Sequence, residues 1–294
     1  MAQILDGAAL AADLRADLRS DIDQLIDANR QPGLATVLMG DDVSAETYVE
    51  KKQQDCAELG IRGVHVDVDS DAPATELYET IEELNADPEI HGILTQDAVP
   101  DHVDWLDAIR RIDPVKDIDG LHPENVGRLV VGDPRYKPCT PHGIQKLLAS
   151  EGIDTEGKDI VIVNRSNIVG KPLANLLVQK STEGNATVTV CHSRTTDLAA
   201  KTRRADILVS AIGVPGFVDE SMVTEETTVI DVGITHEETE SGRKAVGDVD
   251  FENVEPVVEY ITPVPGGVGP MTRVMLLYNT VEAARMQENA PDDE

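Results

Sequence analysis

Aromatic side chains are scarce in this chain of 294 residues, where Phe, Trp and Tyr together make up 3%. Val, Ile, Leu and Ala must therefore fill the interior, and apolar residues at 40% are enough for a packed core. No apolar run approaches the roughly 20 residues that cross a bilayer, and no basic stretch precedes an apolar one at the N-terminus. We therefore expect a cytoplasmic protein with no signal peptide and no membrane partner.

Cysteine is also rare, and the chain lacks clusters of metal-binding residues. The three cysteines lie far apart and include no Cys-x-x-Cys pair: Cys56, Cys139 and Cys191. We interpret them as small buried groups rather than as a disulfide framework or a zinc site. Three histidines near motifs likewise lack the spacing of metal ligands: His122, His142 and His192. No catalytic metal is expected.

Basic residues are few, with 25 Lys and Arg against 55 Asp and Glu, which gives a net charge of −30. Such charges repel one another in dilute buffer, whereas molar salt shortens the Debye length to about 3 Å. The acidic residues are scattered rather than gathered in one block. This favours a solvated surface adapted to a salt-rich cytoplasm over an acidic segment for a basic partner. Nucleic-acid binding is not expected, because phosphate backbones need basic faces.

Helical and strand patterns alternate through the first part of the chain. The predicted order is helix 6–29, strand 34–39, helix 44–59, strand 61–68, a helix through Leu77, Ile81 and Leu84, and strand 92–96. A segment rich in Pro, Gly and Asp follows at 113–142. Alternation of this kind predicts a mainly parallel sheet covered by helices.

A second series of strands follows that segment, and its pattern is typical of a doubly wound nucleotide-binding domain. The predicted strands are 159–163, 186–190, 206–210 and 228–232. A last helix is expected at about 271–288. The sequence therefore predicts an α/β protein of two domains. Residues 1–140 with 271–294 form an α/β catalytic domain, to which the C-terminal helix returns, and residues 141–270 form a Rossmann-type domain.

The first strand of the second series is followed by a loop, Asn164–Pro172, and then by a helix. This geometry directs backbone N–H groups at a phosphate, although without a Gly-x-Gly-x-x-Gly pattern an ordinary strand–helix turn is the simpler interpretation. The next strand ends in Cys191-His192-Ser193-Arg194-Thr195, without the acidic residue that binds the ribose of NAD. With Arg165 in the loop, this favours NADP, unless Arg165 and Arg194 are only solvated surface residues.

Tyr48 and Lys52 lie four residues apart on one predicted helix and so share a face. Alone, such a pair is usually a surface pair. Further motifs occur along the chain: Ser44-x-x-x-Tyr48-x-x-x-Lys52, Lys116-Asp117-Ile118-Asp119-Gly120, Pro138-Cys139-Thr140-Pro141, Val246-Gly247-Asp248-Val249 and Pro265-Gly266-Gly267-Val268-Gly269-Pro270-Met271-Thr272. Together they resemble the methylene-tetrahydrofolate dehydrogenase/cyclohydrolase family, and the Asn164–Pro172 loop resembles its Gly-x-Ser-x-x-Val-Gly-x-Pro loop. The motifs run from about residue 44 to 272, and the Pro265–Thr272 string is the most specific.

The resemblance implies that the first domain binds folate and the second binds NADP. Lys52 is expected to be catalytic, with Tyr48 packing against the folate and Gln96 hydrogen-bonding the lysine. Asp119 is expected to bind the pterin ring. The implied substrate contacts are Ser44, Tyr48, Asp119, Pro265, Gly266 and Gly267, and the implied cofactor contacts are Asn164, Arg165, Ser166, Gly170, His192, Ser193 and Ile234. A homodimer through the nucleotide-binding domains is implied as well.

The implied activity joins two reactions of one-carbon metabolism. NADP oxidises 5,10-methylene-tetrahydrofolate to the 5,10-methenyl form, and water then converts this cation to 10-formyl-tetrahydrofolate. Hydrolysis needs a proton acceptor, and a lysine beside a cationic ring loses its proton more readily than usual. Dehydrogenation depends mostly on positioning the methylene carbon against the cofactor.

Three positions depart from the family pattern. Gln96-Asp97-Ala98-Val99-Pro100 replaces the family's Gln-Leu-Pro-Leu-Pro, which leaves open a different tetrahydropterin carrier. Asn164 stands in place of a glycine, and asparagine tolerates left-handed backbone at a higher cost. Arg273 replaces a small apolar residue. Two further alternatives are an NADP dehydrogenase for another small substrate, such as a 2-oxo acid derivative, and an inactive binding protein on the same fold. The joint presence of Tyr48, Lys52, Gln96 and Asp119 argues against the inactive protein.

Overall fold

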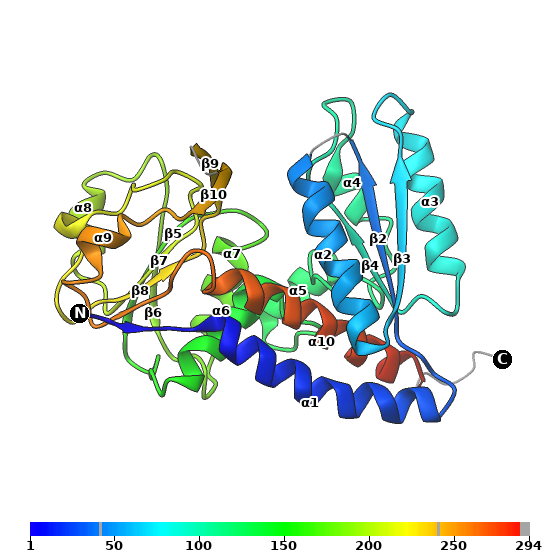
Figure 1. The fold of residues 1–294 in the computed structure, drawn as a ribbon, viewed down its shortest axis with the longest axis horizontal. Coiled ribbons are helices and arrows are strands. Elements are labelled where there is room, and N and C mark those ends of the chain that lie inside the picture. The colour runs from blue at the N-terminus through cyan, green and yellow to red at the C-terminus, as the bar shows by residue number, and fades with distance from the viewer. Residues whose placement is uncertain (41–42, 240–241, 289–294) are drawn as a thin grey trace. The chain divides into compact units, whose positions relative to one another are not determined.

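The structure is a computed structural model that describes residues 1–40, 43–239 and 242–288, without the side chains of 43–48, 238–239, 242–243 and 288 (Figure 1). The chain divides into two compact units. Unit 1 comprises Met1–Ala12 and Pro138–Val274, and unit 2 comprises Asp13–Lys137 and Met275–Glu294. The α/β class and the two-part organisation expected from the sequence are confirmed.

Unit 2 contains a three-stranded parallel sheet in the order β3-β2-β4. The strands are β2 (Gly33–Met39), β3 (Arg62–Val68) and β4 (Gly92–Thr95). Every residue of β2 is buried, as expected for the central strand of a parallel sheet. Helices α2 (Val43–Leu59) and α3 (Ala74–Ala86) form the crossovers that parallel strands require. These elements match the predicted order.

Among its described residues, unit 2 has four further helices. Two follow β4, and two cross its boundaries with unit 1 in the sequence. They are α4 (Trp105–Ile109) and α5 (Pro123–Val131), together with α1 (Gly7–Asp27) and α10 (Val268–Glu288), which both begin in the residue ranges of unit 1. Asn279 of α10 donates hydrogen bonds to the carbonyls of Ile118 (2.7 Å) and Lys137 (2.9 Å). The C-terminal helix therefore belongs largely to unit 2, as the sequence predicts.

Unit 1 contains a six-stranded parallel sheet in the order β1-β11-β8-β7-β5-β6. Its strands are β1 (Gln3–Ile4), β5 (Asp159–Val163), β6 (Thr187–Cys191), β7 (Ile207–Ser210), β8 (Thr228–Asp231) and β11 (Tyr260–Ile261). Alternate residues of β5 enter two different apolar clusters. Ile160 and Ile162 belong to one, Val161 and Val163 to the other. Both faces of the sheet are therefore covered, as in a doubly wound domain.

Helices of unit 1 follow the strands. They are α6 (Cys139–Ser150), α7 (Gly170–Leu177), α8 (Leu198–Thr202), α9 (Phe251–Val254) and the 3₁₀ turn η1 (Glu220–Met222). Leu173 and Leu177 of α7 are fully buried in the cluster that includes Ile160. An antiparallel hairpin of β9 (Thr235–Thr239) and β10 (Gly242–Val246) interrupts the series. The sequence analysis did not identify this hairpin.

The first twelve residues lie in unit 1, whereas the predicted boundaries assign them to the other domain. Their strand β1 pairs with β11, with Gln3 opposite Tyr260 and Ile4 opposite Ile261. Leu5 is fully buried in the core of unit 1. A strand of two residues has no detectable periodicity, so only the tertiary pairing reveals where this segment belongs.

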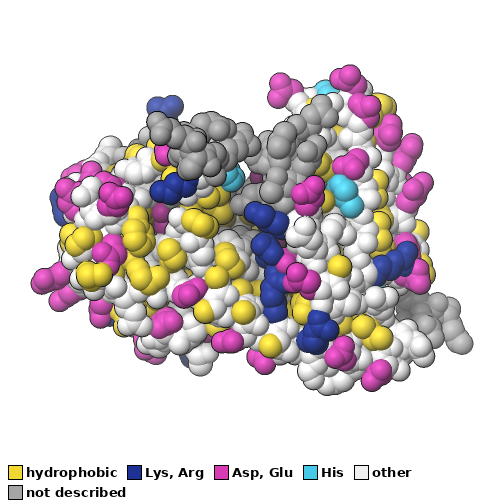
Figure 2. Space-filling model, in the orientation of Figure 1, with side chains coloured by type: hydrophobic (Ala, Val, Ile, Leu, Met, Phe, Trp, Pro, Cys, Tyr) yellow, Lys and Arg dark blue, Asp and Glu magenta, His cyan; other side chains and the backbone are white. Residues whose placement is uncertain are grey.

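The surface reflects the acidic composition. Figure 2 shows Asp and Glu side chains spread over the visible face rather than gathered in one patch. In the described part of the chain, no helix combines the length and the apolar character needed to cross a membrane.

Candidate active site

Lys52 and Gln96, which are 44 residues apart in the sequence, lie close together in unit 2. Lys52 is on α2 and Gln96 directly follows β4; the Lys52 Nζ donates to the Gln96 Oε1 at 3.5 Å. The Gln96 Nε2 is buried and has no hydrogen-bond partner among the described residues. Buried amide N–H groups almost always find an acceptor. This one is therefore suited to a ligand oxygen beside the lysine.

Ser44 and Tyr48 also lie on α2, where Tyr48 is one turn before Lys52. The side chains of both residues fall outside the described part of the structure. Their predicted contacts with substrate therefore remain predictions.

Asp119 is half-buried in the segment 113–122, which the buried Lys116 fixes at one end. The Lys116 Nζ donates to the carbonyls of Leu84 (3.1 Å), Asn85 (2.8 Å) and Asp87 (2.8 Å) at the end of α3. Carbonyls at a helix C-terminus lack partners within the helix, so a cation there satisfies them. Burial lowers the pKa of Lys116. This lysine of the motif thus acts as a helix cap.

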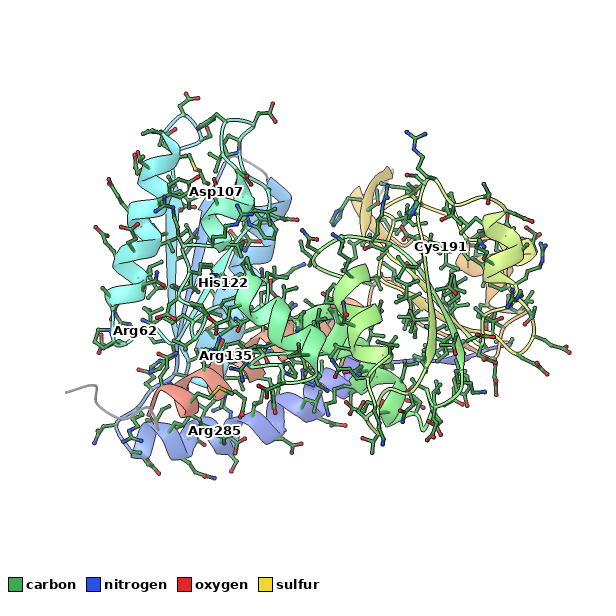
Figure 3. The ribbon with its side chains drawn as sticks, turned by 180° about the vertical axis from the view of Figure 1, so that it is seen from behind. Arg62, Asp107, His122, Arg135, Cys191 and Arg285 are labelled. Atoms are coloured by element: carbon green, nitrogen blue, oxygen red, sulfur yellow. The ribbon has the colours of Figure 1, made fainter. Side chains whose placement is uncertain are left out.

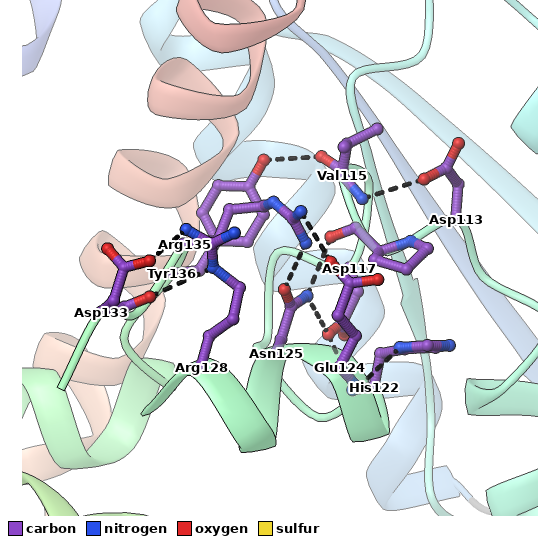
Figure 4. A network of polar contacts seen from close by, with 11 residues as sticks. Asp113, Val115, Asp117, His122, Glu124, Asn125, Arg128, Asp133, Arg135 and Tyr136 are labelled. Atoms are coloured by element: carbon purple, nitrogen blue, oxygen red, sulfur yellow. Dashed lines mark hydrogen bonds and ion pairs between the residues drawn. The ribbon is translucent and has the colours of Figure 1, made fainter. Parts of the chain in front are cut away.

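Asp117 holds the centre of the same segment and is 1% exposed. Its carboxylate accepts hydrogen bonds from the backbone N–H groups of Leu121 (3.2 Å) and His122 (2.7 Å) and from the Asn125 Nδ2 (2.7 Å) (Figure 4). Burial raises the pKa of Asp117 to about 7, although the hydrogen bond from Asn125 opposes that shift. These bonds close the turn that carries Asp119.

Arg135 extends this network from outside the segment. Its Nη1 donates to the Asn125 Oδ1 at 2.6 Å and its Nη2 to the Glu124 Oε1 at 2.8 Å. Asn125 in turn donates to the carbonyl of Pro114 at 2.8 Å. Both partners of Arg135 lie on α5, and Arg135 is labelled in Figure 3. Asn125 and Arg135 could not be found from the sequence, because a lone Asn and a lone Arg carry no signal. Only the structure shows that Asn125 bonds to the buried Asp117 carboxylate and that Arg135 bonds to Asn125.

In unit 1 four strands end at one edge of the sheet. Val163 pairs with both Cys191 and Ser210, and Ser210 pairs with Asp231. The loops after β5, β6, β7 and β8 therefore leave the sheet side by side; Cys191, at the end of β6, is labelled in Figure 3. In open α/β sheets, ligands bind outside the carboxyl ends of the strands.

The loop after β5 is organised by the side chain of Asn164. Its Oδ1 accepts hydrogen bonds from the N–H groups of Ser166 (2.7 Å) and Gly170 (3.0 Å), and its Nδ2 donates to the carbonyl of Ala211. Among the residues that the structure describes, the non-glycine positions with positive φ are Asn29, Asn185 and Asp197. Asn164 is not one of them, so its amide rather than a left-handed backbone accounts for its place in the loop.

Gly170, at the start of α7, cannot be replaced without moving the loop. A Cβ there would lie 2.2 Å from the carbonyl oxygen of Asn164. The Ser166 Oγ accepts a hydrogen bond from the N–H of Val169 at 3.0 Å. Three of the predicted cofactor residues, Asn164, Ser166 and Gly170, thus form a compact backbone turn before a helix N-terminus, a geometry that suits a phosphate.

The loop after β6 brings basic and hydroxyl groups to the same edge. Arg165, Ser193 and Arg194 are exposed. The His192 Nδ1 accepts a hydrogen bond from the N–H of Arg194 at 3.1 Å, and the N–H of His192 donates to the Thr195 Oγ1 at 2.9 Å. Because β5 and β6 are neighbours, this donor set and the phosphate-type turn fit a phosphorylated dinucleotide.

The remaining predicted residues of unit 1 lie on two other loops. Ile234 follows β8 and is 39% exposed. Pro265 is exposed, and the carbonyl of Gly266, which has φ +111°, accepts a hydrogen bond from the N–H of Ala8 at 2.8 Å. A Cβ on Gly267 would lie 2.7 Å from the carbonyl oxygen of Pro263. The turn is therefore restricted to glycine by its own backbone.

The chain matches models of a known enzyme family and holds no candidate metal site among its described residues. Within residues 1–40, 43–239 and 242–288, no group of three or more His, Cys, Asp or Glu could hold a metal ion. The family model described as "Tetrahydrofolate dehydrogenase/cyclohydrolase, catalytic domain" matches residues 5–119. The model described as "Tetrahydrofolate dehydrogenase/cyclohydrolase, NAD(P)-binding domain" matches residues 138–288.

Whole-chain relatives agree with these matches. The "Bifunctional protein FolD" of Natronomonas pharaonis is 61% identical over 98% of both chains. A solved methylenetetrahydrofolate dehydrogenase/cyclohydrolase from Campylobacter jejuni is 44% identical, with a TM-score of 0.92 over 98% of this chain and 100% of that one. The Trypanosoma brucei enzyme, solved with NADP and an inhibitor, is 37% identical, with a TM-score of 0.93 over 98% and 99% of the two chains. The chain therefore belongs to the tetrahydrofolate dehydrogenase/cyclohydrolase family.

Proposed function

We propose that this chain oxidises 5,10-methylene-tetrahydrofolate with NADP and hydrolyses the resulting methenyl cation to 10-formyl-tetrahydrofolate. The observation that carries the proposal is the pairing of Lys52 with Gln96 at the end of β4, in a chain that belongs to this family throughout its length. A different tetrahydropterin carrier is not favoured, because the family model and the whole-chain relative are both named for tetrahydrofolate derivatives.

In the hydrolysis step, water adds to the methenyl carbon and must lose a proton as its oxygen bonds to that carbon. The Lys52 side chain accepts this proton at Nζ, and the Gln96 Oε1, 3.5 Å from Nζ, holds the amine in place. The bond from the carbon to the pterin N5 then breaks as the hydroxyl on that carbon gives up its proton and becomes the formyl C=O. N5 takes up a proton, and the formyl group stays on N10. Asp119 accepts hydrogen bonds from N–H groups of the pterin ring and so orients the substrate.

For the dehydrogenation, NADP supplies the acceptor of the hydride that leaves the methylene carbon. The chain contributes binding and orientation rather than an acid or a base. The Asn164 and Ser166 side chains hold the N–H groups of Ser166, Val169 and Gly170 and so shape the turn. The other N–H groups of this turn before α7 would bind phosphate oxygens, as at other strand–helix turns. Arg165 and Ser193 are exposed on neighbouring loops, and they bind the 2′-phosphate that distinguishes NADP from NAD.

The purified protein in molar salt tests the proposal directly. With methylene-tetrahydrofolate it should reduce NADP, and with methenyl-tetrahydrofolate it should form the 10-formyl product without any nucleotide. Activity with another reduced pterin but none with tetrahydrofolate derivatives would replace the proposed substrate. Absence of both reactions would leave a binding protein on this fold.

We also propose a homodimer formed through unit 1. Strand β6 is the last strand of the six-stranded sheet, and β5 is its partner. Thr187, Thr189 and Val190 on this edge are exposed, Val190 by 38%. An open strand edge is a template for pairing with a second chain. Light scattering in molar salt should give twice the mass of 31.7 kDa, and Val190→Lys should give monomers.

The net charge of −30 supports work in a salt-rich cytoplasm. Removal of salt lengthens the range of repulsion among these charges, so the melting temperature should fall when molar salt is dialysed away. An unchanged melting temperature and full activity in dilute buffer would contradict this adaptation.

A further inference from the structure

We infer that Asp231 and Asp248, two buried carboxylates of unit 1, are positioning residues for the cofactor. Together they fix the backbone of the loops that follow β7 and β8, at the edge of the sheet where the Asn164–Gly170 turn lies. The inference rests on the proposed binding of NADP by unit 1 and goes beyond it, because neither carboxylate belongs to the predicted contact residues.

Asp248 is fully buried and binds the loop after β7. Its Oδ2 accepts hydrogen bonds from the Ser210 Oγ (2.9 Å) and the Ile212 N–H (2.6 Å), and its Oδ1 from the N–H groups of Gly213 (2.8 Å) and Val214 (2.9 Å). One carboxylate thus captures successive backbone N–H groups. Such an arrangement leaves the loop a single conformation, because any other would strand a buried charge.

Asp231 connects that loop to the next one. Its Oδ1 accepts hydrogen bonds from the N–H groups of Gly233 and Asp248, both at 3.0 Å, and its Oδ2 from the N–H of Val249 at 2.9 Å. Gly233 immediately precedes Ile234, a predicted cofactor contact. Asp231 therefore holds both the backbone of its fellow carboxylate and the start of the loop after β8.

Two glycines show how closely these groups are packed. A Cβ on Gly233 would lie 2.1 Å from the Asp248 Oδ1, and a Cβ on Gly247 would lie 2.0 Å from the Asp231 Oδ2. Each carboxylate thus occupies the space that a side chain would need on the glycine beside it. Burial raises the pKa of Asp231 to about 6, which is the cost of placing an acid here.

The network also reaches the phosphate-type turn. The Asn164 Nδ2 donates to the carbonyl of Ala211, the first residue of the loop that Asp248 holds. A continuous path therefore runs from the turn through Ala211 and Asp248 to Asp231 and Gly233. Apolar side chains would fill a core more cheaply than buried carboxylates do. Among the described residues of unit 1, the buried carboxylates are those of Asp231 and Asp248, and both lie where loops leave the carboxyl ends of the strands. In such a sheet this is where a binding site forms, so their placement serves its geometry.

Asp248→Asn tests the inference, because its amide keeps the shape but presents N–H groups to N–H donors. Calorimetric titration should show NADP binding weakened by about 10- to 100-fold, the loss of one or two hydrogen bonds to a charged group. The KM for NADP should rise in parallel, with a smaller change in kcat. Cyclohydrolase activity, assayed with added methenyl-tetrahydrofolate, should stay within about twofold, because Lys52, the proposed proton acceptor, and Gln96, which holds it, lie in unit 2.

Asp250→Asn is the matched control, since this exposed carboxylate accepts a hydrogen bond from the Asn253 Nδ2 (2.7 Å). It should bind NADP like the wild type. If Asp248→Asn binds NADP normally, the inference is overturned. If that variant does not fold, Ser210→Ala decides: it removes one bond to Asp248, and its NADP affinity must fall by several-fold or the inference is wrong. Failure of the wild type itself to bind NADP would instead overturn the proposed function.

Discussion

The groups proposed to act in units 1 and 2 differ in kind. In unit 2 the groups are side chains, with Lys52 on a helix, Gln96 after a strand and Asp119 in a loop. In unit 1 they are mainly backbone N–H groups of loops at the ends of parallel strands, arranged around Asn164 and Gly170. The first arrangement suits proton transfer, which needs a titrating group, and the second suits the binding of a phosphorylated ligand.

Both units nevertheless fix these groups with buried carboxylates that accept hydrogen bonds from backbone N–H groups. Asp117 in unit 2 closes the turn that carries Asp119 and so lies two residues from the side chain proposed to bind the pterin ring. Asp231 and Asp248 in unit 1 bond directly to the loops proposed to bind the cofactor. A buried carboxylate is favourable only when its oxygens are fully bonded, which makes it an effective constraint on loop conformation.

The largest expected effect concerns the side chain in unit 2. Lys52→Met keeps an apolar stem but removes the base, so cyclohydrolase activity should fall by a factor on the order of 10²–10⁴. Dehydrogenase activity should fall much less, since it depends on positioning. Both rates are measured on one preparation. Lys51→Met is the control. Lys51 lies at the preceding position of α2 and is exposed, so this change should alter neither rate. A parallel loss of both activities would make Lys52 a binding residue.

The next effect concerns cofactor choice in unit 1. Arg165→Ala should weaken the binding of NADP by about 10- to 100-fold and should change the binding of NAD little. The reason is the loss of a charge-assisted contact worth about 1.5–3 kcal/mol. The measurement is the ratio of kcat/KM for the two cofactors. Lys146→Ala removes a positive charge elsewhere in unit 1, where it pairs with Glu183 at 3.2 Å, and serves as the control. Equal losses for NADP and NAD would refute the assignment of Arg165 to the 2′-phosphate.

A smaller effect is expected when the anchor of unit 2, the bonded group of Asp117, Asn125 and Arg135, is weakened. Asn125→Ala leaves the Asp117 carboxylate and the Arg135 guanidinium each without one partner, which should lower the free energy of unfolding by about 1–3 kcal/mol. The KM for the folate substrate should rise, while NADP affinity, a property of unit 1, should not change. Denaturant unfolding and steady-state kinetics measure these quantities. Asn253→Ala, which removes an exposed amide, should alter neither. A parallel rise in the Kd for NADP would show that the two anchors are not independent.

The last prediction concerns the pH dependence of stability at Asp117. Burial raises the pKa of Asp117 to about 7, well above the usual value for an aspartate. The folded protein therefore favours the neutral carboxyl, so the stability linked to it is present near pH 4 and is lost as the pH rises to about 7. The difference in unfolding free energy between wild type and Asp117→Asn, whose amide does not titrate, should follow this course. A difference that stays constant over that range would show that Asp117 titrates normally.

Much of the fold could be predicted because its elements are long and periodic. The β2 run of Gly33–Met39 is mostly apolar and is buried throughout, and the helix through Leu77 and Ile81 buries the face that its spacing predicts. The pairing of Lys52 with Gln96 could be predicted only through the family resemblance. Asn125, Arg135 and Asp231 could not be predicted, since each gains its role from partners that are distant in the sequence or bonded through the backbone.

The sequence by itself determined the alternation of strands and helices, the acidic surface and the family motifs, because periodicity, charge and local spacing are properties of neighbouring residues. The tertiary structure alone decided that Met1–Ala12 belongs to unit 1, where β1 pairs with β11. It also decided which acids act as anchors. Asp117 and Asp248 read as ordinary acidic residues until folding removes them from water and surrounds them with backbone N–H donors.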